Sequence, residues 1–467
     1  MDLQAYLNQA FGHIRRWEDG WGVYNRHPSL SVDENRLEEA FATYLERLES
    51  NYPFFHPRYA GQMLKPPHPV AVASYLAAQL INPNNHALDG GPPTAQMEKE
   101  AVRELAAMFR LPDETLGHLT SSGTIANLEA LWVARELHPD KAVAFSEEAH
   151  YTHGRMSQVL GLDTVKLPID AHGRLRLDAL EEALRTGRIG TVVMTPGTTP
   201  LGAVDPIADA VDLCRRHECR IHVDAAYGGF FTLLAWAEEA SGLLSDAVQR
   251  HFRAIARCDS VVVDPHKHGL QPYGCGCILF RDPSVGRFYK HDSPYTYFTS
   301  DELHLGEISL ECSRAGASAG ALWLTLQVFP LRADEGLGPI LAACRRAALA
   351  WSERIAGSDV LRPYVAPELD IVTYYPTPEP CAASVLDAAS QRLFERAMYD
   401  SDDPVFLSVL RADTASLQAG LPRLVADQPG ARILRSVLMH PEHEHFVDSL
   451  FDKLEAWTGE ASSVIGQ

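Results

Sequence analysis

The amino-acid sequence predicts an α/β fold with a mostly parallel sheet that is covered by helices on both faces. From about residue 83 to residue 330, short apolar runs with the length of buried strands alternate with helical patterns. Alternation of this kind is typical of a parallel sheet with helical crossovers. The chain of 467 residues is also too long for one ordinary hydrophobic core, so we expect two or three structural units.

Residues 1–82 are predicted to form an N-terminal helical arm. Apolar residues recur at helical spacing at Leu37, Phe41, Leu45 and Leu48. The stretch that follows contains five prolines between positions 53 and 69, and it reads NYPFFHPRYAGQMLKPPHP. Since these prolines break the backbone ladder, the stretch cannot be one helix. We interpret it as an arm or a segment that lines a site.

Residues 83–330 are predicted to form a large domain that carries the sheet. Helical patterns run over Met97–Phe109, Leu177–Leu184 and Ile207–Arg216. The expected strands lie in the runs KAVAFS, VKLPI, IGTVVMTP, CRIHVDAA, DSVVVDP and CGCILF. Ligands of such sheets bind at the carboxyl ends of the strands, which makes the residues after these runs candidates for a site.

Residues 331–467 are predicted to form a smaller α/β C-terminal domain. Strand patterns recur in DIVTYY and ARILRSVLM, and a helix is expected over Glu442–Trp457. The stretch HPEHEH at residues 440–445 resembles a metal cluster. A proline and two glutamates also suit the first turn of a helix, and we favour that interpretation.

The composition argues against several classes of protein. A net charge of −20 disfavours nucleic acid and anionic membrane surfaces as partners. We find no secretory signal pattern and no apolar run long enough for a membrane helix, so we expect a cytoplasmic protein. The eight cysteines form no repeated CxxC pair, which argues against a zinc site. Cys275 and Cys277 are either a redox or ligand pair or, as we favour, buried core thiols.

Five stretches at strand ends or helix starts carry polar side chains that could do chemistry. The first, TSSGTIANLEAL at residues 120–131, opens a helix with Ser122, Gly123 and Thr124. Free backbone N–H groups, hydroxyls and the helix dipole at such a turn form a cradle for a phosphate. The alternative is a simply capped helix with Thr120 or Ser121 at the N-cap, and both interpretations remain open.

The second and third stretches are SEEAHYTHGR and TPGTTPLGAVDPI. His150, in the second, could stack on a planar ring or act as a base, although a lone histidine is more often structural. Thr198 and Thr199, in the third, follow a buried strand, where hydroxyl and backbone groups can meet a ligand. The alternative for the third stretch is an ordinary turn, which its Pro and Gly residues would explain.

The fourth stretch, HVDAAYGGF, places Asp224 at the end of a strand that should be buried. A buried carboxylate needs a partner. Small residues beside it, Ala226 among them, leave room for a flat group, and a carboxylate facing a ring nitrogen would keep that nitrogen protonated. A core ion pair or a helix cap explains the aspartate equally well.

The fifth stretch, DPHKHG, places Lys267 in a short loop between two strands that read as buried. Burial and cationic neighbours lower the pKa of an amine and free it as a nucleophile. The alternative for Lys267 is an ordinary exposed lysine in a loop. His266, beside it, could contact a phosphate. In this order, the phosphate cradle, stacking histidine, buried aspartate and loop lysine are the parts that hold pyridoxal 5′-phosphate (PLP).

These stretches, with ISLECSRAGASAGALW at residues 308–323, resemble the PLP-dependent group II amino acid decarboxylases of fold type I. That family includes aromatic amino acid, glutamate, histidine and tyrosine/aspartate decarboxylases. The resemblance spans residues 83–330. It implies a PLP-dependent transferase-like fold with a mostly parallel, seven-stranded sheet. It also implies a carboxy-lyase that converts an L-amino acid to its amine and CO₂ through a Lys267 Schiff base and a quinonoid intermediate, and a homodimer with shared active sites.

The resemblance also implies a role for each matching residue. Lys267 would carry the aldehyde of PLP, Asp224 would pair with the ring nitrogen, and Ala226 and His150 would face the ring. The phosphate would be held by Ser122, Gly123, Thr124 and His266, with Thr198 or Thr199 near the ring substituents. Tyr295 or Tyr297 of a loop at residues 288–307 would donate a proton.

The substrate stays open at this point. His56, Tyr59, Asn85, His86 and Phe298 are candidates for its side-chain pocket. A free arginine would favour an acidic substrate, but we expect Arg314 to form a structural ion pair or a dimer contact. Other PLP activities remain as alternatives (carbon–carbon lyase, aminotransferase or aldehyde-forming decarboxylase), and a non-catalytic binding protein is a remote one.

Overall fold

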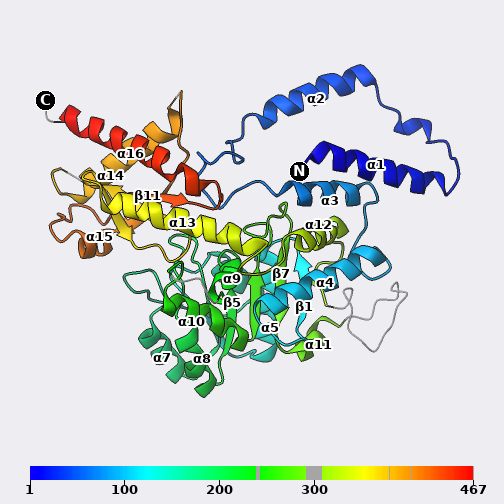
Figure 1. The fold of residues 1–467 in the computed structure, drawn as a ribbon. Helices are drawn as coiled ribbons and strands as arrows, with labels where there is room; N and C mark the ends of the chain where they lie inside the picture. Colours follow the sequence, from blue (N-terminus) through cyan, green and yellow to red (C-terminus); the bar gives the residue numbers. More distant parts are fainter. Residues whose placement is uncertain (238–241, 291–307, 378, 401, 466–467) are drawn as a thin grey trace.

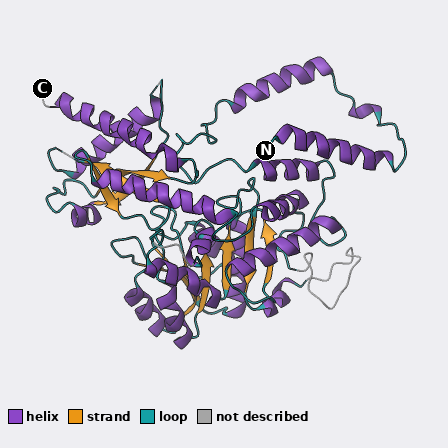
Figure 2. Ribbon diagram, in the orientation of Figure 1, coloured by secondary structure: helices purple, strands orange, loops and turns teal. Residues whose placement is uncertain are grey.

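The computed structural model describes residues 1–237, 242–290, 308–377, 379–400 and 402–465 (Figure 1). Its centre is a seven-stranded sheet with helices on both sides (Figure 2). The strands are β1 (Leu116–Thr120), β2 (Ala142–Ser146), β3 (Thr164–Leu167), β4 (Ile189–Met194), β5 (Arg220–Asp224), β6 (Ser260–Val263) and β7 (Gly276–Phe280). Their order is β1-β7-β6-β5-β4-β2-β3.

The prediction of a mostly parallel sheet is confirmed. Strands β3, β2, β4, β5 and β6 run parallel, and only β7 is antiparallel to its two neighbours, β6 and β1. Every residue of β4 and β6 is buried, as expected for strands covered on both faces. Strand β1 is not among the predicted strands, because its run LGHLT contains a polar residue, His118. In the fold, His118 is buried with its Nε2 2.8 Å from Glu129.

The helices of this part of the chain are α4 (Pro92–Met108), α5 (Gly123–Leu137), α6 (Thr152–Leu160), α7 (Leu177–Arg185), α8 (Ile207–Arg216), α9 (Thr232–Ala235), α10 (Asp246–Ala254), α11 (Gly286–Tyr289) and α12 (Gly316–Val328). The helical patterns predicted from the sequence correspond to α4, α5, α7 and α8. Three of these helices, α5, α6 and α9, begin shortly after β1, β2 and β5, so the carboxyl ends of these strands meet helix starts.

A separate four-stranded antiparallel sheet follows, in the order β10-β11-β9-β8. Its elements are α13 (Leu337–Ala356), β8 (Leu361–Val365), β9 (Ile371–Pro376), α14 (Ala383–Tyr399), β10 (Ser408–Asp413), α15 (Thr414–Gly420), β11 (Gly430–Val437) and α16 (His443–Ile465). Trp351 and Tyr374 are fully buried in the core beneath this sheet. The domain boundaries at residues 82/83 and 330/331 stay predictions.

The N-terminal arm begins with α1 (Leu3–Asp19), α2 (Glu34–Leu48) and α3 (Pro69–Gln79). Helix α3 packs on α12, and α1 packs on α3. Every residue of α2 is exposed, and the helix stands away from the two sheets (Figure 1). As predicted, the proline-rich stretch between α2 and α3 forms no helix. None of the described helices combines the length and the apolar character that crossing a membrane requires.

The HPEHEH stretch lies where α16 begins, in agreement with the helix-start interpretation. His440 and His443 are buried, and the Nε2–H of His443 donates to the carbonyl of Pro57 over 2.8 Å. Burial lowers the pKa of His440 to about 3 and that of His443 to about 4. Both rings are therefore neutral at neutral pH, and one of them ties the arm to the small sheet.

These buried histidines predict a loss of stability in mild acid. Below the ordinary pKa of about 6.5, the unfolded chain protonates these rings while the folded chain does not, so stability falls as the pH falls towards 4. For His443 we expect roughly 3 kcal/mol between pH 6.5 and pH 4. Urea unfolding of His443→Gln across this range should show a shallower pH slope than the wild type. Exposed His445, on the same helix, is the control, and His445→Gln should keep the full slope.

Candidate active site

A cavity of about 260 Å³ lies at the carboxyl ends of β4, β5 and β6. Nine of the predicted cofactor-site residues line it: Ser122, Gly123, Thr124, His150, Thr199, Asp224, Ala226, His266 and Lys267. They come from segments up to 145 positions apart in the sequence. The fold therefore brings the predicted set together in one place.

The N-terminus of α5 forms one wall of the cavity. Ser122 is the N-cap, and its hydroxyl accepts from the backbone N–H of Ile125 over 3.3 Å. The N-cap is therefore neither Thr120 nor Ser121, the two residues proposed for that position if the turn were only a helix cap. Thr120 instead donates its hydroxyl to the carbonyl of Ser122. Gly123 and Thr124 line the cavity, and backbone N–H groups in the first turn of a helix lack intrahelical partners, so this wall suits an anion.

Asp224 ends β5 and lies under the cavity, where its Oδ2 is 2.8 Å from Nε2 of His153. Burial alone would raise the Asp224 pKa. The hydrogen bond from His153 and the charges of His153 and Lys267 outweigh burial, so the pKa lies well below its usual range. Asp224 is therefore a carboxylate anion, and within the described part of the chain its other oxygen accepts one hydrogen bond, from the backbone N–H of Ala226 over 3.2 Å.

Lys267 follows β6 and lies beside a second carboxylate. Its Nζ is 3.1 Å from Oδ2 of Asp264. His266 donates from Nδ1 to the carbonyl of Cys275 over 2.7 Å, since a carbonyl only accepts. The Nε2 of His266 then lies 3.5 Å from the same Asp264 oxygen. Burial lowers the pKa of His266, so its ring is neutral near pH 7 unless an anion binds beside it.

His150 and Ala226 both line the cavity. The His150 ring is fixed by Nδ1, 2.7 Å from the hydroxyl of Thr152. Burial lowers the pKa of His150, and Lys267 adds to this effect while Asp224 opposes it. The ring is therefore neutral and apolar enough near pH 7 to pack against a flat group.

The loop after β4 carries the two predicted threonines, and the structure separates their positions. Thr199 lines the cavity, whereas Thr198 is fully buried and its hydroxyl accepts from Ala203 N–H over 3.1 Å. Arg435 of β11 holds this loop by donating to the carbonyls of Thr199 (2.7 Å) and Pro200 (2.9 Å). The small sheet thus positions one wall of the site.

The loop also passes very close to the HVDAAYGG stretch. A Cβ added to Gly228 would lie 1.8 Å from the carbonyl oxygen of Pro196. Any other residue at position 228 would push the two walls apart, which explains the glycine.

A buried cluster anchors the Lys267 loop to the small sheet. The Nε2 of His268 lies 3.2 Å from Oδ2 of Asp370, and the hydroxyl of Tyr227 donates to Oδ1 of Asp370 over 2.5 Å. Tyr227 also lines the cavity. Because Asp370 precedes β9, the cluster links the second sheet to the residue next to Lys267.

Three predicted residues lie outside the described part of the chain: Tyr295, Tyr297 and Phe298. The four other residues suggested for the substrate pocket do not line the cavity in this chain. Tyr59 packs against Phe406, His56 against Phe446, and Asn85 donates to Glu98 over 2.6 Å. His86 lies 3.9 Å from Asp89.

Arg314 forms the structural ion pair that we expected. Its NH1 lies 2.5 Å from Glu98 and also donates to the carbonyl of Leu119. NH2 donates to the carbonyl of Asn85. An arginine bound in this way is not free to hold an acidic substrate.

Sequence reasoning missed His153, Tyr227 and Asp264. His153 had a usable signal, because it lies three residues after His150, in the first turn of α6 that follows the β2 strand end. Tyr227 stands inside a stretch that was singled out for its aspartate. Asp264 precedes Pro265 and was interpreted only as part of the loop. The ion pair between Asp264 and Lys267, three residues later, forms because of the turn after β6.

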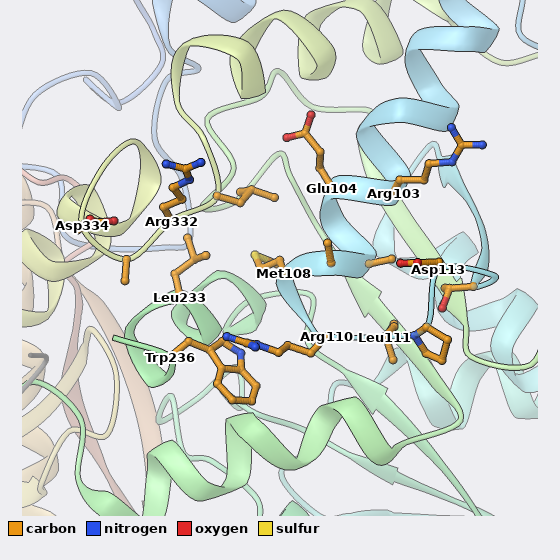
Figure 3. Close-up of a pocket in the computed structure, with 16 residues that line it drawn as sticks. Arg103, Glu104, Met108, Arg110, Leu111, Asp113, Leu233, Trp236, Arg332 and Asp334 are labelled. Carbon is orange, nitrogen blue, oxygen red and sulfur yellow. The ribbon is translucent and has the colours of Figure 1, made fainter. Parts of the chain in front are cut away.

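A larger depression of about 1030 Å³ lies elsewhere, between the C-terminal end of α4, α9 and the segment before α13 (Figure 3). The guanidinium of Arg110 lies 4.2 Å from the centroid of the Trp236 ring. Both positively and negatively charged side chains line this depression: Arg103, Arg332, Glu104, Asp113 and Asp334. None of its lining residues is a lysine. The smaller cavity around Lys267 is therefore the candidate active site.

Comparison with known proteins identifies the family. The family model described as "Pyridoxal-dependent decarboxylase conserved domain" matches residues 54–356. The chain belongs to this decarboxylase family. It is 28% identical over 447 residues to the L-tyrosine decarboxylase of Enterococcus faecium, covering 74% of this chain and 73% of that protein. It is 30% identical over 341 residues to a probable L-tyrosine/L-aspartate decarboxylase of Methanocella arvoryzae, covering 72% of this chain and 84% of that protein.

Solved structures show the same fold. The Oryza sativa protein TDC, crystallised with PLP and tryptamine, superposes with a TM-score of 0.77 at 20% identity, covering 98% of each chain. Mouse CSAD gives a TM-score of 0.77 at 21% identity, covering 97% of this chain and 98% of that one. The expected fold type I architecture is thus confirmed, and the decarboxylase is a PLP-dependent carboxy-lyase that acts on an amino acid.

The residues of the cavity fit PLP. A Cβ at Gly123 would lie 2.5 Å from a carboxylate oxygen of Asp264, so the glycine keeps the wall beside α5 open. The free N–H groups of α5 suit a phosphate, the Asp224 anion suits a protonated ring nitrogen, and Lys267 supplies an amine for the aldehyde.

Proposed function

We propose that this decarboxylase converts a neutral aromatic L-amino acid, with L-tyrosine as the first candidate, to the corresponding amine and CO₂, using Lys267 as the residue that carries the cofactor. The observation that supports this most strongly is that Lys267 and the Asp224 anion line one cavity whose far wall is a helix N-terminus. PLP, when bound, supplies an electron sink that accepts the charge left when CO₂ departs.

Each wall of the cavity has a task in this reaction. Ser122, Gly123, Thr124 and His266 would hold the phosphate, whose charge would favour a proton on His266. Asp224 would keep the ring nitrogen protonated, which would make the ring a better electron acceptor. His150 and Ala226 would confine the ring, so that the substrate is held in a fixed orientation to it.

Proton delivery to Cα stays a proposal on sequence grounds. Tyr295 and Tyr297 are the two candidates, and both lie outside the described residues. Replacing each by phenylalanine should distinguish them, because the proton donor's loss lowers kcat while leaving cofactor binding intact.

A neutral substrate is supported by the charges of the described site. Arg435, which holds the Thr199 loop of the cavity, is bound to backbone carbonyls, and Arg314, which lines a separate pocket, is bound to Glu98. Neither is available for a second carboxylate of an acidic substrate. Tyr151 and Tyr227 line the cavity and offer aromatic surface. Relatives named L-tyrosine decarboxylase and aromatic-L-amino-acid decarboxylase support the same class, while the Methanocella arvoryzae relative is named for L-aspartate as well as L-tyrosine.

A product assay tests the proposed reaction. Purified, PLP-loaded protein is incubated with L-tyrosine, L-phenylalanine, L-tryptophan, L-aspartate, L-glutamate and L-2,4-diaminobutyrate, and amine, CO₂, aldehyde and ammonia are measured separately. We expect amine and CO₂ in equal amounts with aromatic substrates. Aldehyde with ammonia would instead assign an oxidative activity, and turnover of aspartate alone would overturn the aromatic class.

We also propose a homodimer in which the two chains share their active sites. Helix α2 exposes a row of apolar side chains that nothing in the described chain covers: Leu37, Phe41, Tyr44, Leu45 and Leu48. Apolar rows of this extent are typical of a surface that is buried in an assembly. We propose that a second copy of the chain covers this row, in keeping with the homodimer with shared active sites that the family resemblance implies.

The dimer gives a sharp prediction for α2. Phe41→Glu with Leu45→Glu should yield a monomer in size-exclusion chromatography with light scattering, because two charges would be buried in the interface. Activity should fall when the dimer is lost, since each active site would then lack the residues that the partner chain contributes. Thr43→Glu places one such negative charge on another face of α2 and should stay dimeric. A wild-type monomer with full activity would rule out shared sites.

A further inference from the structure

Asp264 is a buried carboxylate that the proposed function leaves without a role. It follows β6 directly, and its side chain is 3% exposed. Its Oδ2 lies 3.1 Å from Nζ of Lys267, while its buried Oδ1 has no hydrogen-bond partner among the residues that the structure describes. Leaving such an oxygen unpaired is unfavourable, so a carboxylate kept in this state is a candidate for use in the chemistry.

The fold holds Asp264 tightly against the anion cradle. A Cβ at Gly123, the first residue of α5, would lie 2.5 Å from Oδ2 and 2.7 Å from Oδ1. The absence of a side chain at position 123 is therefore what lets the carboxylate approach both α5 and Lys267. This placement is costly for phosphate binding, because two anions then share one buried space.

Lys267 is the cation that faces Asp264 directly. The other titratable groups around it come from three further places: His150 before α6, Tyr273 and Cys275 before β7, and Asp224 at the end of β5. Burial lowers the pKa of His150 and His266 and raises that of Tyr273 and Cys275, so these four groups are neutral near pH 7. Asp224 is paired with His153.

We propose that Asp264 is the proton acceptor for Lys267 when the lysine joins the cofactor. The carboxylate takes one proton from the lysine ammonium, which leaves a neutral amine and a carboxylic acid. The amine lone pair then forms a bond to the aldehyde carbon, and the aldehyde oxygen leaves as water. When a substrate amine displaces Lys267, the acid returns its proton to the lysine. Neutralising Asp264 also removes its repulsion from the phosphate.

Cofactor uptake by cofactor-free protein tests this role without any turnover. Asp264→Asn keeps the size of the side chain and removes the acceptor. Stopped-flow absorbance of the imine band after addition of PLP should give a rate about 10²-fold lower than in the wild type. Its rate should rise more steeply with pH, because the proton must then leave to solvent. Borohydride reduction followed by mass spectrometry confirms that the bond is to Lys267.

Two controls separate proton transfer from damage to the pocket. Pyridoxamine 5′-phosphate has no aldehyde, and we expect it to bind Asp264→Asn as tightly as the wild type or more tightly, since one negative charge is gone. Asp212→Asn removes an exposed carboxylate of the same domain, which pairs with Arg257, and should load PLP at the wild-type rate.

Two results would overturn the role of Asp264. One is a wild-type rate and pH profile of imine formation in Asp264→Asn. The other is loss of pyridoxamine phosphate binding in that variant, which would make the residue structural. Because this role rests on the proposed function of Lys267, the wild type serves as the reference. If it forms no imine band, the proposed function itself fails.

Discussion

Lys267→Ala will lack the visible absorbance band of the loaded enzyme and will lose at least about 10³-fold in kcat with every substrate, because no other described lysine lines the cavity. The amine at this position is the nucleophile that holds the cofactor and is released again at each turnover. The measurements are the absorbance spectrum after PLP addition and the rate of amine release.

Lys166→Ala is the matched control for this variant. Lys166 lies on β3 with an exposed side chain, away from the cavity, so its loss should leave both the spectrum and the rate unchanged. Retention of the band in Lys267→Ala would show that the cofactor aldehyde is bound elsewhere, and it would remove the basis for the proposed function.

Asp224→Ala will lower kcat by about 10² to 10³-fold, because the ring nitrogen loses the anion that keeps it protonated. The smaller side chain leaves space beside that nitrogen. A PLP analogue methylated at the ring nitrogen carries a permanent positive charge there, so it should restore part of the activity to Asp224→Ala and should not improve the wild type. Failure of this rescue would mean that Asp224 acts through packing and not through charge.

His153 provides an independent test of the same site. Removing one partner of a buried ion pair leaves an unpaired charge, so His153→Ala should lower the free energy of unfolding by roughly 3 kcal/mol in the cofactor-free protein. The loss should be smaller with PLP bound, since the ring nitrogen then faces Asp224. Urea unfolding with and without PLP measures both values, and equal losses would place the ring away from Asp224.

A great deal of the site could be predicted from the sequence. Lys267, Asp224 and the Ser122–Thr124 turn stand directly after strands or before a helix, and the carboxyl ends of neighbouring parallel strands meet at one edge of a sheet. The alternation of apolar runs with helical patterns predicted the fold class, and the order of these short stretches along the chain predicted the cofactor. The runs of β2, β4, β6 and β7 are largely apolar because both faces of the sheet are buried along these strands.

Contacts between segments that are far apart in the sequence were decided only by the tertiary structure. Strand β1 was missed because its polar His118 is paired with Glu129 on α5, and no local pattern shows that pairing. The partners of Asp224 and Lys267, which are His153 and Asp264, depend on how α6 and the turn after β6 direct their side chains.

The sequence by itself determined the elements of the large sheet and the residue types needed to hold PLP, because local periodicity and turn chemistry are written in neighbouring positions. Only the tertiary structure decided which charges meet, which threonine faces the cavity, and that Arg435 and Asp370 of the small sheet hold the catalytic loops. The physical reason is that buried charges are stabilised by partners close in space, and those partners need not be close in sequence.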